Sequence, residues 1–103
     1  MTTSPHLLTL DLTGVADKAG LMERVASGLG LPDWFGRNWD ALTESLGDTS
    51  LWPPEAVGRG LLVVVTGWQG YARTRPDEWE TARRVFTDAS ADEPALTVTL
   101  APQ

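Results

Sequence analysis

Carboxylates are the side chains of this sequence with the clearest capacity for chemistry. Asp40 and Glu44 stand four residues apart, Asp48 follows at the same interval, and the last predicted helix adds further acids. Paired carboxylates can cleave glycosides or hold Mg²⁺, but such sites need a cleft, which a chain of 103 residues has little room to build. We therefore expect no enzyme, and a small carboxylate enzyme is the alternative that saturable metal binding would reveal.

Other catalytic and cofactor-binding patterns are missing from the sequence. There is no cysteine, and the one histidine, His6, cannot build a His-rich metal site. There is also no Gly-x-Gly-x-x-Gly fingerprint, no phosphate loop ending in Gly-Lys-Ser or Gly-Lys-Thr, and no zinc-ligand spacing. We expect no catalytic nucleophile, no metal site and no cofactor.

The charge balance restricts the class of partner. Fourteen acidic residues against eight basic ones give a formal net charge of −6. This argues against direct binding of nucleic acid and favours a basic partner. No apolar run is long enough to span a bilayer, and residues 1–20 lack the features of a signal peptide. We expect one cytoplasmic domain over residues 1–103 that does not bind membranes.

A predicted helix must position the first two carboxylates. The chain is extended at Leu31-Pro32, Gly36 permits a tight bend, and Asn38 is a good N-cap. The helix should therefore start at about Trp39. Its acidic residues would then project from a rigid element rather than from a loop.

This helix has two faces. Trp39, Leu42 and Leu46 recur at helical spacing and, with Phe35 from the preceding loop, are assigned to the core. On the other face Asp40 and Glu44 form a like-charged pair four residues apart, which destabilises the helix by about 0.2–0.5 kcal/mol without a local gain. Such a departure is expected at a functional site, and a merely solvated acidic face is the other explanation. The face away from the core carries Asp40, Thr43, Glu44 and Gly47.

The rest of the chain predicts alternating strands and helices. Strands are expected at residues 6–12, 61–66 and 95–101, and further helices at 17–29 and 77–90, with a short turn or helix reaching residue 75. This order predicts an α/β fold in which a three-stranded parallel sheet, in order 1-2-3, packs with three to four helices. The β-branched run at 61–66 predicts a central strand buried on both faces. Pro53-Pro54 should exclude a helix from residues 48–59.

Three further tryptophans are assigned to packing: Trp52, Trp68 and Trp79. Trp52 should pin the loop at residues 48–59 onto the body of the protein. Trp68 follows the carboxyl end of the central strand, where α/β proteins often bind ligands. A small-ligand site at Trp68 is therefore an alternative.

A helix face with carboxylates beside an aromatic loop can also bind a protein. It presents an acidic anchor, surrounded by apolar contacts, to a basic cleft. An active site that holds a phosphate group is such a cleft, because Arg, Lys and His line it. Carboxylates on a rigid helix would imitate that phosphate, and complementary fields would speed association.

The run Leu31-Pro32-Asp33-Trp34-Phe35-Gly36, then Asn38, then Asp40-Ala41-Leu42, resembles the barstar family. Members of that family carry Leu-Pro, an acid, two aromatics and Gly, followed after one residue of any type by Asn and after another by Asp-Ala-Leu. The strong match covers about residues 29–47, and a weaker one covers the order of elements elsewhere. The resemblance implies three parallel strands in sequential order and a protein that inhibits a nuclease.

The resemblance also implies a role for each matching residue. Trp34 looks like the loop aromatic that packs on the nuclease's catalytic histidine, and Gly36 like the glycine whose backbone lies close to the nuclease. Asp40 corresponds to a peripheral acid, and Glu44 falls where the family has the central Asp that enters the active site. Asp88 matches an acid of the last helix that pairs with a nuclease arginine.

The chain departs from the family pattern at several of these positions. Thr43, which with Gly47 completes the predicted partner-binding face, stands where the archetype has an interface tryptophan. Arg37 replaces an acid, Glu44 replaces Asp, and Asp88 replaces Glu. These departures concern the identity of the partner and the affinity for it more than the fold.

The sequence thus predicts an inhibitor, monomeric when free, that blocks a basic ribonuclease. The expected partner is a secreted, guanyl-specific ribonuclease of the barnase type, or a related nuclease toxin, against which the inhibitor protects the producing cell. The alternative is an interaction module of the same fold with a partner that is not a nuclease, which the departure at Thr43 favours.

Overall fold

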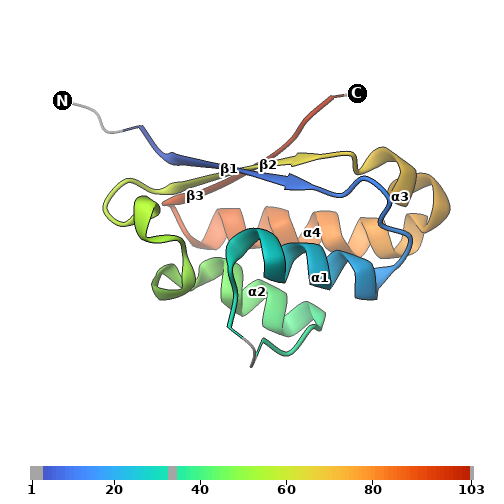
Figure 1. Cartoon of the computed structure of the whole chain (residues 1–103), viewed down its shortest axis with the longest axis horizontal. Coiled ribbons are helices and arrows are strands. Elements are labelled where there is room, and N and C mark those ends of the chain that lie inside the picture. Colours follow the sequence, from blue (N-terminus) through green and yellow to red (C-terminus); the bar gives the residue numbers. More distant parts are fainter. Residues whose placement is uncertain (1–3, 33–34, 103) are drawn as a thin grey trace.

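The computed structural model describes residues 4–32 and 35–102, which form a layer of strands with helices packed against it. Figure 1 shows α1 and α4 beneath one face of the sheet, α2 farther from the sheet and packed against α4, and α3 beyond the carboxyl end of β2. In chain order the elements are β1 (His6–Asp11), α1 (Lys18–Leu29), α2 (Trp39–Gly47), η1 (Thr49–Leu51), η2 (Pro54–Ala56), β2 (Leu61–Thr66), α3 (Gln69–Thr74), α4 (Pro76–Asp92) and β3 (Leu96–Leu100).

The three strands form one parallel sheet in the order β1-β2-β3. Leu8 lies opposite Val63, and Val63 lies opposite Val98, so side chains of one parity line one face across all strands. Helical connections carry the chain from each strand to the next, as parallel pairing requires. The predicted α/β class, parallel pairing and strand order are confirmed.

Helices cover only one face of this sheet. Leu61, Val63 and Val65 of β2 are at most 1% exposed, whereas the intervening Leu62 and Val64 are half-buried. The prediction that this strand is buried on both faces was wrong. A continuous apolar run also suits the middle strand of a two-layer fold, because neighbouring strands shield part of its open face.

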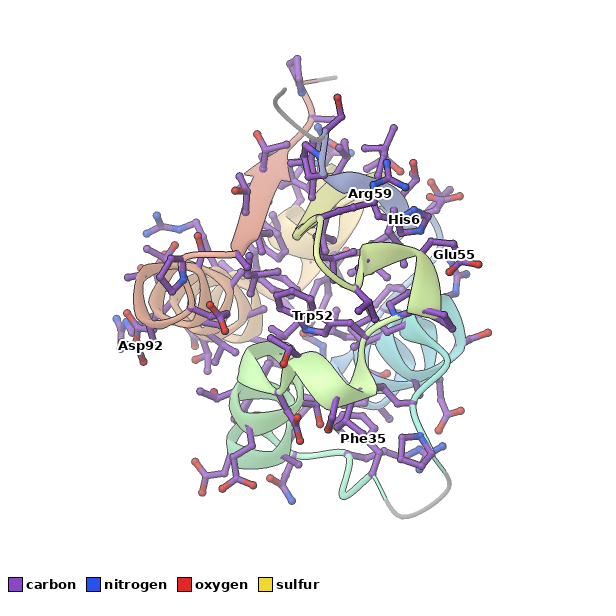
Figure 2. All side chains as sticks on the ribbon, turned by 90° about the vertical axis from the view of Figure 1, so that its left-hand side faces the viewer. His6, Phe35, Trp52, Glu55, Arg59 and Asp92 are labelled. Carbon is purple, nitrogen blue, oxygen red and sulfur yellow. The ribbon has the colours of Figure 1, made fainter. Side chains whose placement is uncertain are left out.

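The core lies between the covered face and the helices. Of the predicted packing tryptophans, Trp52 and Trp79 are buried in it and Trp68 packs against it. The Trp52 indole donates a hydrogen bond to the carbonyl oxygen of Leu46 at 3.0 Å, and Figure 2 places Trp52 in the middle of the molecule. Trp68 stacks on Trp79 with ring centroids 5.1 Å apart, and its indole donates to the Ala101 carbonyl oxygen at 3.0 Å. The packing prediction is confirmed for all three.

Local signals account for most element boundaries. The Asp17 side chain accepts from the Gly20 N–H and caps α1, and Gly30 ends that helix with a φ of 65°. The expected loop at residues 48–59 instead contains the short 3-10 helices η1 and η2. Pro54 is tolerated as the first residue of η2, because that position needs no backbone donor.

Candidate partner-binding site

The loop before α2 is held in place by Asn38. Its side-chain oxygen accepts a hydrogen bond from the Ala41 N–H at 2.8 Å, which caps the helix as predicted. Its side-chain amide donates to the Gly36 carbonyl oxygen at 3.2 Å. One side chain thus fixes both the start of the helix and the loop in front of it.

The tight bend in this loop occurs at Arg37, not at the predicted Gly36. Arg37 has a φ of 49°, and its guanidinium pairs with Glu23 of α1 and donates to the Phe35 carbonyl oxygen at 3.1 Å. Gly36 serves a different purpose, since a Cβ there would lie 3.1 Å from the Asn38 amide nitrogen and 3.3 Å from the Ala41 Cβ. A Cβ there would crowd both groups, so Gly36 allows close packing and is not needed for a left-handed backbone.

Helix α2 separates a buried side from an exposed acidic side. Leu42 and Leu46 are at most 1% exposed, and Phe35 is 3% exposed, as predicted for core residues. Trp39 is only half-buried, with the ammonium of Lys18 5.5 Å from its ring centroid. The assignment of Trp39 to the buried core was therefore wrong. It lies in the first turn of α2 and packs against the margin of the core.

The structure brings most of the predicted contact residues onto one element. Asp40, Glu44 and Gly47 are exposed on α2, as the helical periodicity predicted. Thr43 is half-buried, and its hydroxyl donates to the Trp39 carbonyl oxygen at 3.0 Å. Trp34 lies outside the described residues.

Asp88 comes from a second element. It is exposed on α4, and α4 packs directly against α2. The acid of the last helix is thus carried by the immediate neighbour of the helix that carries Asp40 and Glu44.

The carboxylates of this surface form no ion pair with any basic group of the described residues. In residues 4–32 and 35–102, the ion pairs involve Glu23, Glu78 and Glu80, and none involves Asp40, Glu44 or Asp88. Two further arginines, Arg24 and Arg59, donate to backbone carbonyl oxygens. Arg24, for example, donates to the carbonyl oxygen of Asp11 at 2.7 Å. No ion pair of the described residues therefore neutralises Asp40 or Glu44 on α2.

A pocket of about 270 Å³ adjoins this surface. Gly36 and Glu44, predicted from the sequence as contacts, meet there. Ser45 and Asp48 line it as well and were not predicted as contacts. The lining residues are Phe35, Gly36, Ala41, Glu44, Ser45, Asp48 and Leu51.

The sequence held a weak signal for each of these missed residues. Ser45 is a polar residue beside the apolar stripe of α2, and it is only 5% exposed. Asp48 precedes Thr49-Ser50, which is the pattern of a residue that caps a turn, and it is the N-cap of η1. Neither signal reveals a pocket, because the pocket forms only when the chain after α2 folds back toward Phe35.

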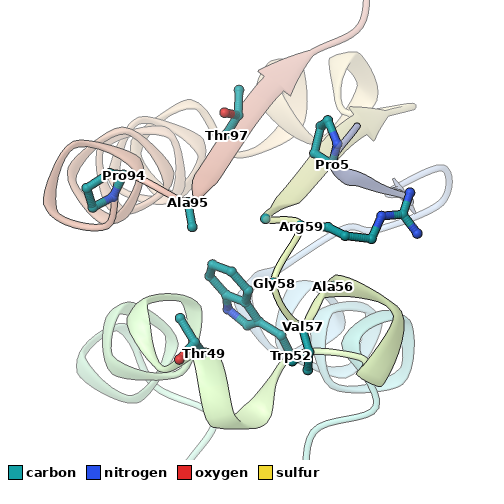
Figure 3. A pocket seen from close by; sticks show the side chains of 11 residues that line it. Pro5, Thr49, Trp52, Ala56, Val57, Gly58, Arg59, Pro94, Ala95 and Thr97 are labelled. Carbon is teal, nitrogen blue, oxygen red and sulfur yellow. The ribbon is translucent and has the colours of Figure 1, made fainter. Parts of the chain in front are cut away.

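A larger groove of about 600 Å³ lies at the amino-terminal ends of the strands (Figure 3). Among its described lining residues Arg59 is the charged one, and its guanidinium donates to the Ser4 carbonyl oxygen at 2.9 Å. Ligands of open parallel sheets bind outside the carboxyl ends of strands, so the position of this groove does not indicate such a site.

The described residues contain no group of three or more His, Asp or Glu side chains arranged to hold a metal ion. In the same part of the chain, no helix combines the length and apolar character needed to cross a membrane.

Comparison with known proteins identifies the family. No curated protein matches the chain significantly. A family model described as Barstar (barnase inhibitor) matches residues 5–101, nearly the whole sequence. The match extends well beyond the motif before α2 and includes all three strands and all four α-helices. This chain belongs to the barstar family.

Proposed function

We propose that this protein inhibits a basic ribonuclease of the barnase type, or a related nuclease toxin, by covering its active site. The observation that carries the proposal is the exposed acidic face of α2, on which Asp40 and Glu44 have no ion-pair partner in the described chain. The family is that of barnase inhibitors, which bind a nuclease and are not enzymes.

The physical basis is charge complementarity on a preorganised element. A ribonuclease gathers cationic side chains around the scissile phosphate, and carboxylates held on a helix can occupy that place. Bidentate pairs between arginine and carboxylate are strong when water is excluded. Because Asn38 and the Leu42 side of α2 fix the helix in place, little conformational entropy is lost when the partner binds.

We assign the central contact to Glu44 and the flanking acidic contacts to Asp40 and Asp88. Trp34, Gly36, Thr43 and Gly47 would surround these acids with less polar contact area. The inhibitor would act inside the cell that makes the nuclease, as a monomer that protects the cell's own RNA.

Inhibition titration tests the proposal. A guanyl-specific ribonuclease of the barnase type is titrated with this protein while RNA cleavage is followed. The Glu44→Ala variant is run alongside, and Glu55→Ala, an exposed acid of η2, serves as the charge-matched control. We expect stoichiometric inhibition that weakens in Glu44→Ala but not in Glu55→Ala. No inhibition at micromolar protein would reject this class of nuclease as the partner.

One observation favours a second candidate. Thr43 is half-buried and its hydroxyl is bonded within α2, so it offers little contact area where the family archetype has a tryptophan. An interaction module with a partner that is not a nuclease would be consistent with that difference. Capture of such a partner, with loss of capture in Glu44→Ala, would support this candidate if nuclease inhibition fails.

A further inference from the structure

The pocket beside Gly36 is the right size for one side chain of a partner. Its volume of about 270 Å³ lies below the roughly 300–1,000 Å³ of sites for drug-sized ligands. It opens between the loop before α2 and the residues that follow the helix. Glu44 and Asp48 contribute carboxylates, Ser45 contributes a hydroxyl, and the remaining lining side chains are apolar.

Ser45 has an unused hydrogen-bonding group at this pocket. Helix threonines of this protein donate to the carbonyl oxygen four residues earlier, as Thr43 does to Trp39 at 3.0 Å and Thr87 to Arg83 at 2.9 Å. In the part of the chain that the structure describes, the Ser45 hydroxyl makes no such bond, although the residue is only 5% exposed. No fully buried side-chain oxygen there lacks a partner, so the Ser45 oxygen is not fully buried, and Ser45 is one of the residues that line the pocket.

Asp48 is fixed in position by its capping role. Its Oδ1 atom accepts from the Ser50 N–H at 3.0 Å and from the Ser50 hydroxyl at 2.6 Å. The other carboxylate oxygen takes part in no hydrogen bond of the described residues. Glu44, four residues earlier, also forms no ion pair there. Two of the pocket's polar groups are therefore carboxylates with negative charge and the third is a neutral hydroxyl that can accept, a set that favours a cationic donor.

We propose that this pocket binds the guanidinium group of an arginine on the partner protein, with Asp48 and Ser45 as contacts in addition to Glu44. This inference rests on the proposed function, since it names the partner group that the same surface receives. Phe35, Ala41 and Leu51 form an apolar lining, which suits a weakly hydrated planar guanidinium better than a strongly hydrated ammonium. The absence of a third acid or His beside these carboxylates in the described residues disfavours a metal ion.

Titration with a small cation tests the pocket without a nuclease. The ¹⁵N-labelled protein is titrated with ethylguanidinium and, separately, with ethylammonium, and amide shifts are followed by NMR. We expect saturable shifts at Gly36, Ser45 and Asp48 with ethylguanidinium, and affinity about tenfold lower in Asp48→Asn and in Ser45→Ala. Asn can still cap η1, and Ser45→Ala removes a single oxygen, so both variants should keep the wild-type thermal midpoint.

Asp77→Asn is the control, because Asp77 is an exposed acid at the start of α4 and its loss changes the net charge equally. Shifts spread over all exposed acids, equal shifts with ethylammonium, or unchanged binding in both pocket variants would overturn the inference. Nuclease titration with the same variants separates the two proposals. Inhibition that is insensitive to Asp48→Asn and Ser45→Ala would reject the arginine pocket but keep the proposal of nuclease inhibition. Guanidinium binding without inhibition would keep the pocket as a guanidinium site but reject nuclease inhibition.

Discussion

The guanidinium of Arg37 pairs with Glu23 on α1 and not with the acids of α2 that follow it in the sequence. This relationship explains why a basic residue can replace an acid of the family pattern without cancelling the acidic surface. The positive charge is drawn toward α1, and its second bond, to the Phe35 carbonyl oxygen, keeps it at the base of the loop. Asp40 and Glu44 therefore remain available to a cationic partner.

Loss of the ion pair between Arg37 and Glu23 should slow association with the nuclease and change the free energy of unfolding little. In Glu23→Ala the freed Arg37 cation would weaken the negative field around α2, so association with a basic ribonuclease at low salt should slow several-fold. The pair is exposed, so the free energy of unfolding should change by no more than about 1 kcal/mol. Stopped-flow association measures the rate, with Glu55→Ala as the charge-matched control. The double variant Glu23→Ala, Arg37→Ala should regain the wild-type association rate. If it does not, Arg37 has no part in the slower association.

Glu44→Ala should separate binding from stability. The exposed carboxylate makes no ion pair in the described chain, so its loss should leave the thermal midpoint unchanged or slightly raised through relief of the Asp40 repulsion. Binding of the ribonuclease should weaken by about 1.5–3 kcal/mol, the range for hydrogen bonds to charged groups. Inhibition constants and thermal unfolding of the same samples provide the comparison. A large fall in thermal midpoint would assign Glu44 to the fold instead.

The stability lost on substitution of Leu42 or Trp39 by alanine should follow the burial of the side chain and not its size. Leu42 is 0% exposed, so Leu42→Ala should cost about 2–5 kcal/mol of unfolding free energy by leaving a cavity. Trp39 is half-buried beside Lys18, so Trp39→Ala should cost less than Leu42→Ala despite removing a larger side chain. Urea unfolding of both variants decides the order. The opposite ranking would mean that Trp39 holds the first turn of α2 in place.

Tyr71 should make the protein lose stability at alkaline pH. Burial of the ring, together with a 3.0 Å hydrogen bond from its hydroxyl to Glu78, raises the pKa of the phenol well above its ordinary 10.0. Below about pH 10 both states keep the proton. Above it the unfolded chain releases a proton that the folded chain retains, so the free energy of unfolding falls, by up to about 1.4 kcal/mol per pH unit, until the folded pKa is reached.

Urea unfolding between about pH 8 and about pH 11 measures this loss, and Tyr71→Phe is the control that lacks the titrating group. Because Tyr71 is the single tyrosine of the chain, tyrosinate absorbance reports its ionisation directly. Ionisation of Tyr71 near its ordinary pKa while the protein stays folded would contradict the proposed linkage.

Several features of the fold could be predicted from the residues alone. The alternation of apolar runs with helical periodicities determined the order of elements, and right-handed crossovers then left little choice but a parallel sheet. Asn38 and Asp17 could be recognised as caps, because capping depends on residues only three positions apart. The exposed acids of α2 followed from the same short-range geometry.

Tertiary structure alone decided the features that depend on distant residues. The open face beside Leu62 and Val64 reflects how many layers of helices the chain supplies, which no property of β2 reveals. Arg37 pairs with Glu23, fourteen residues earlier, and the left-handed backbone lies at Arg37 and not at Gly36. The pocket at Ser45 and Asp48 exists because η1 folds back toward Phe35. Sequence thus determined which residues are acidic and helical, whereas long-range packing determined which of them share a surface.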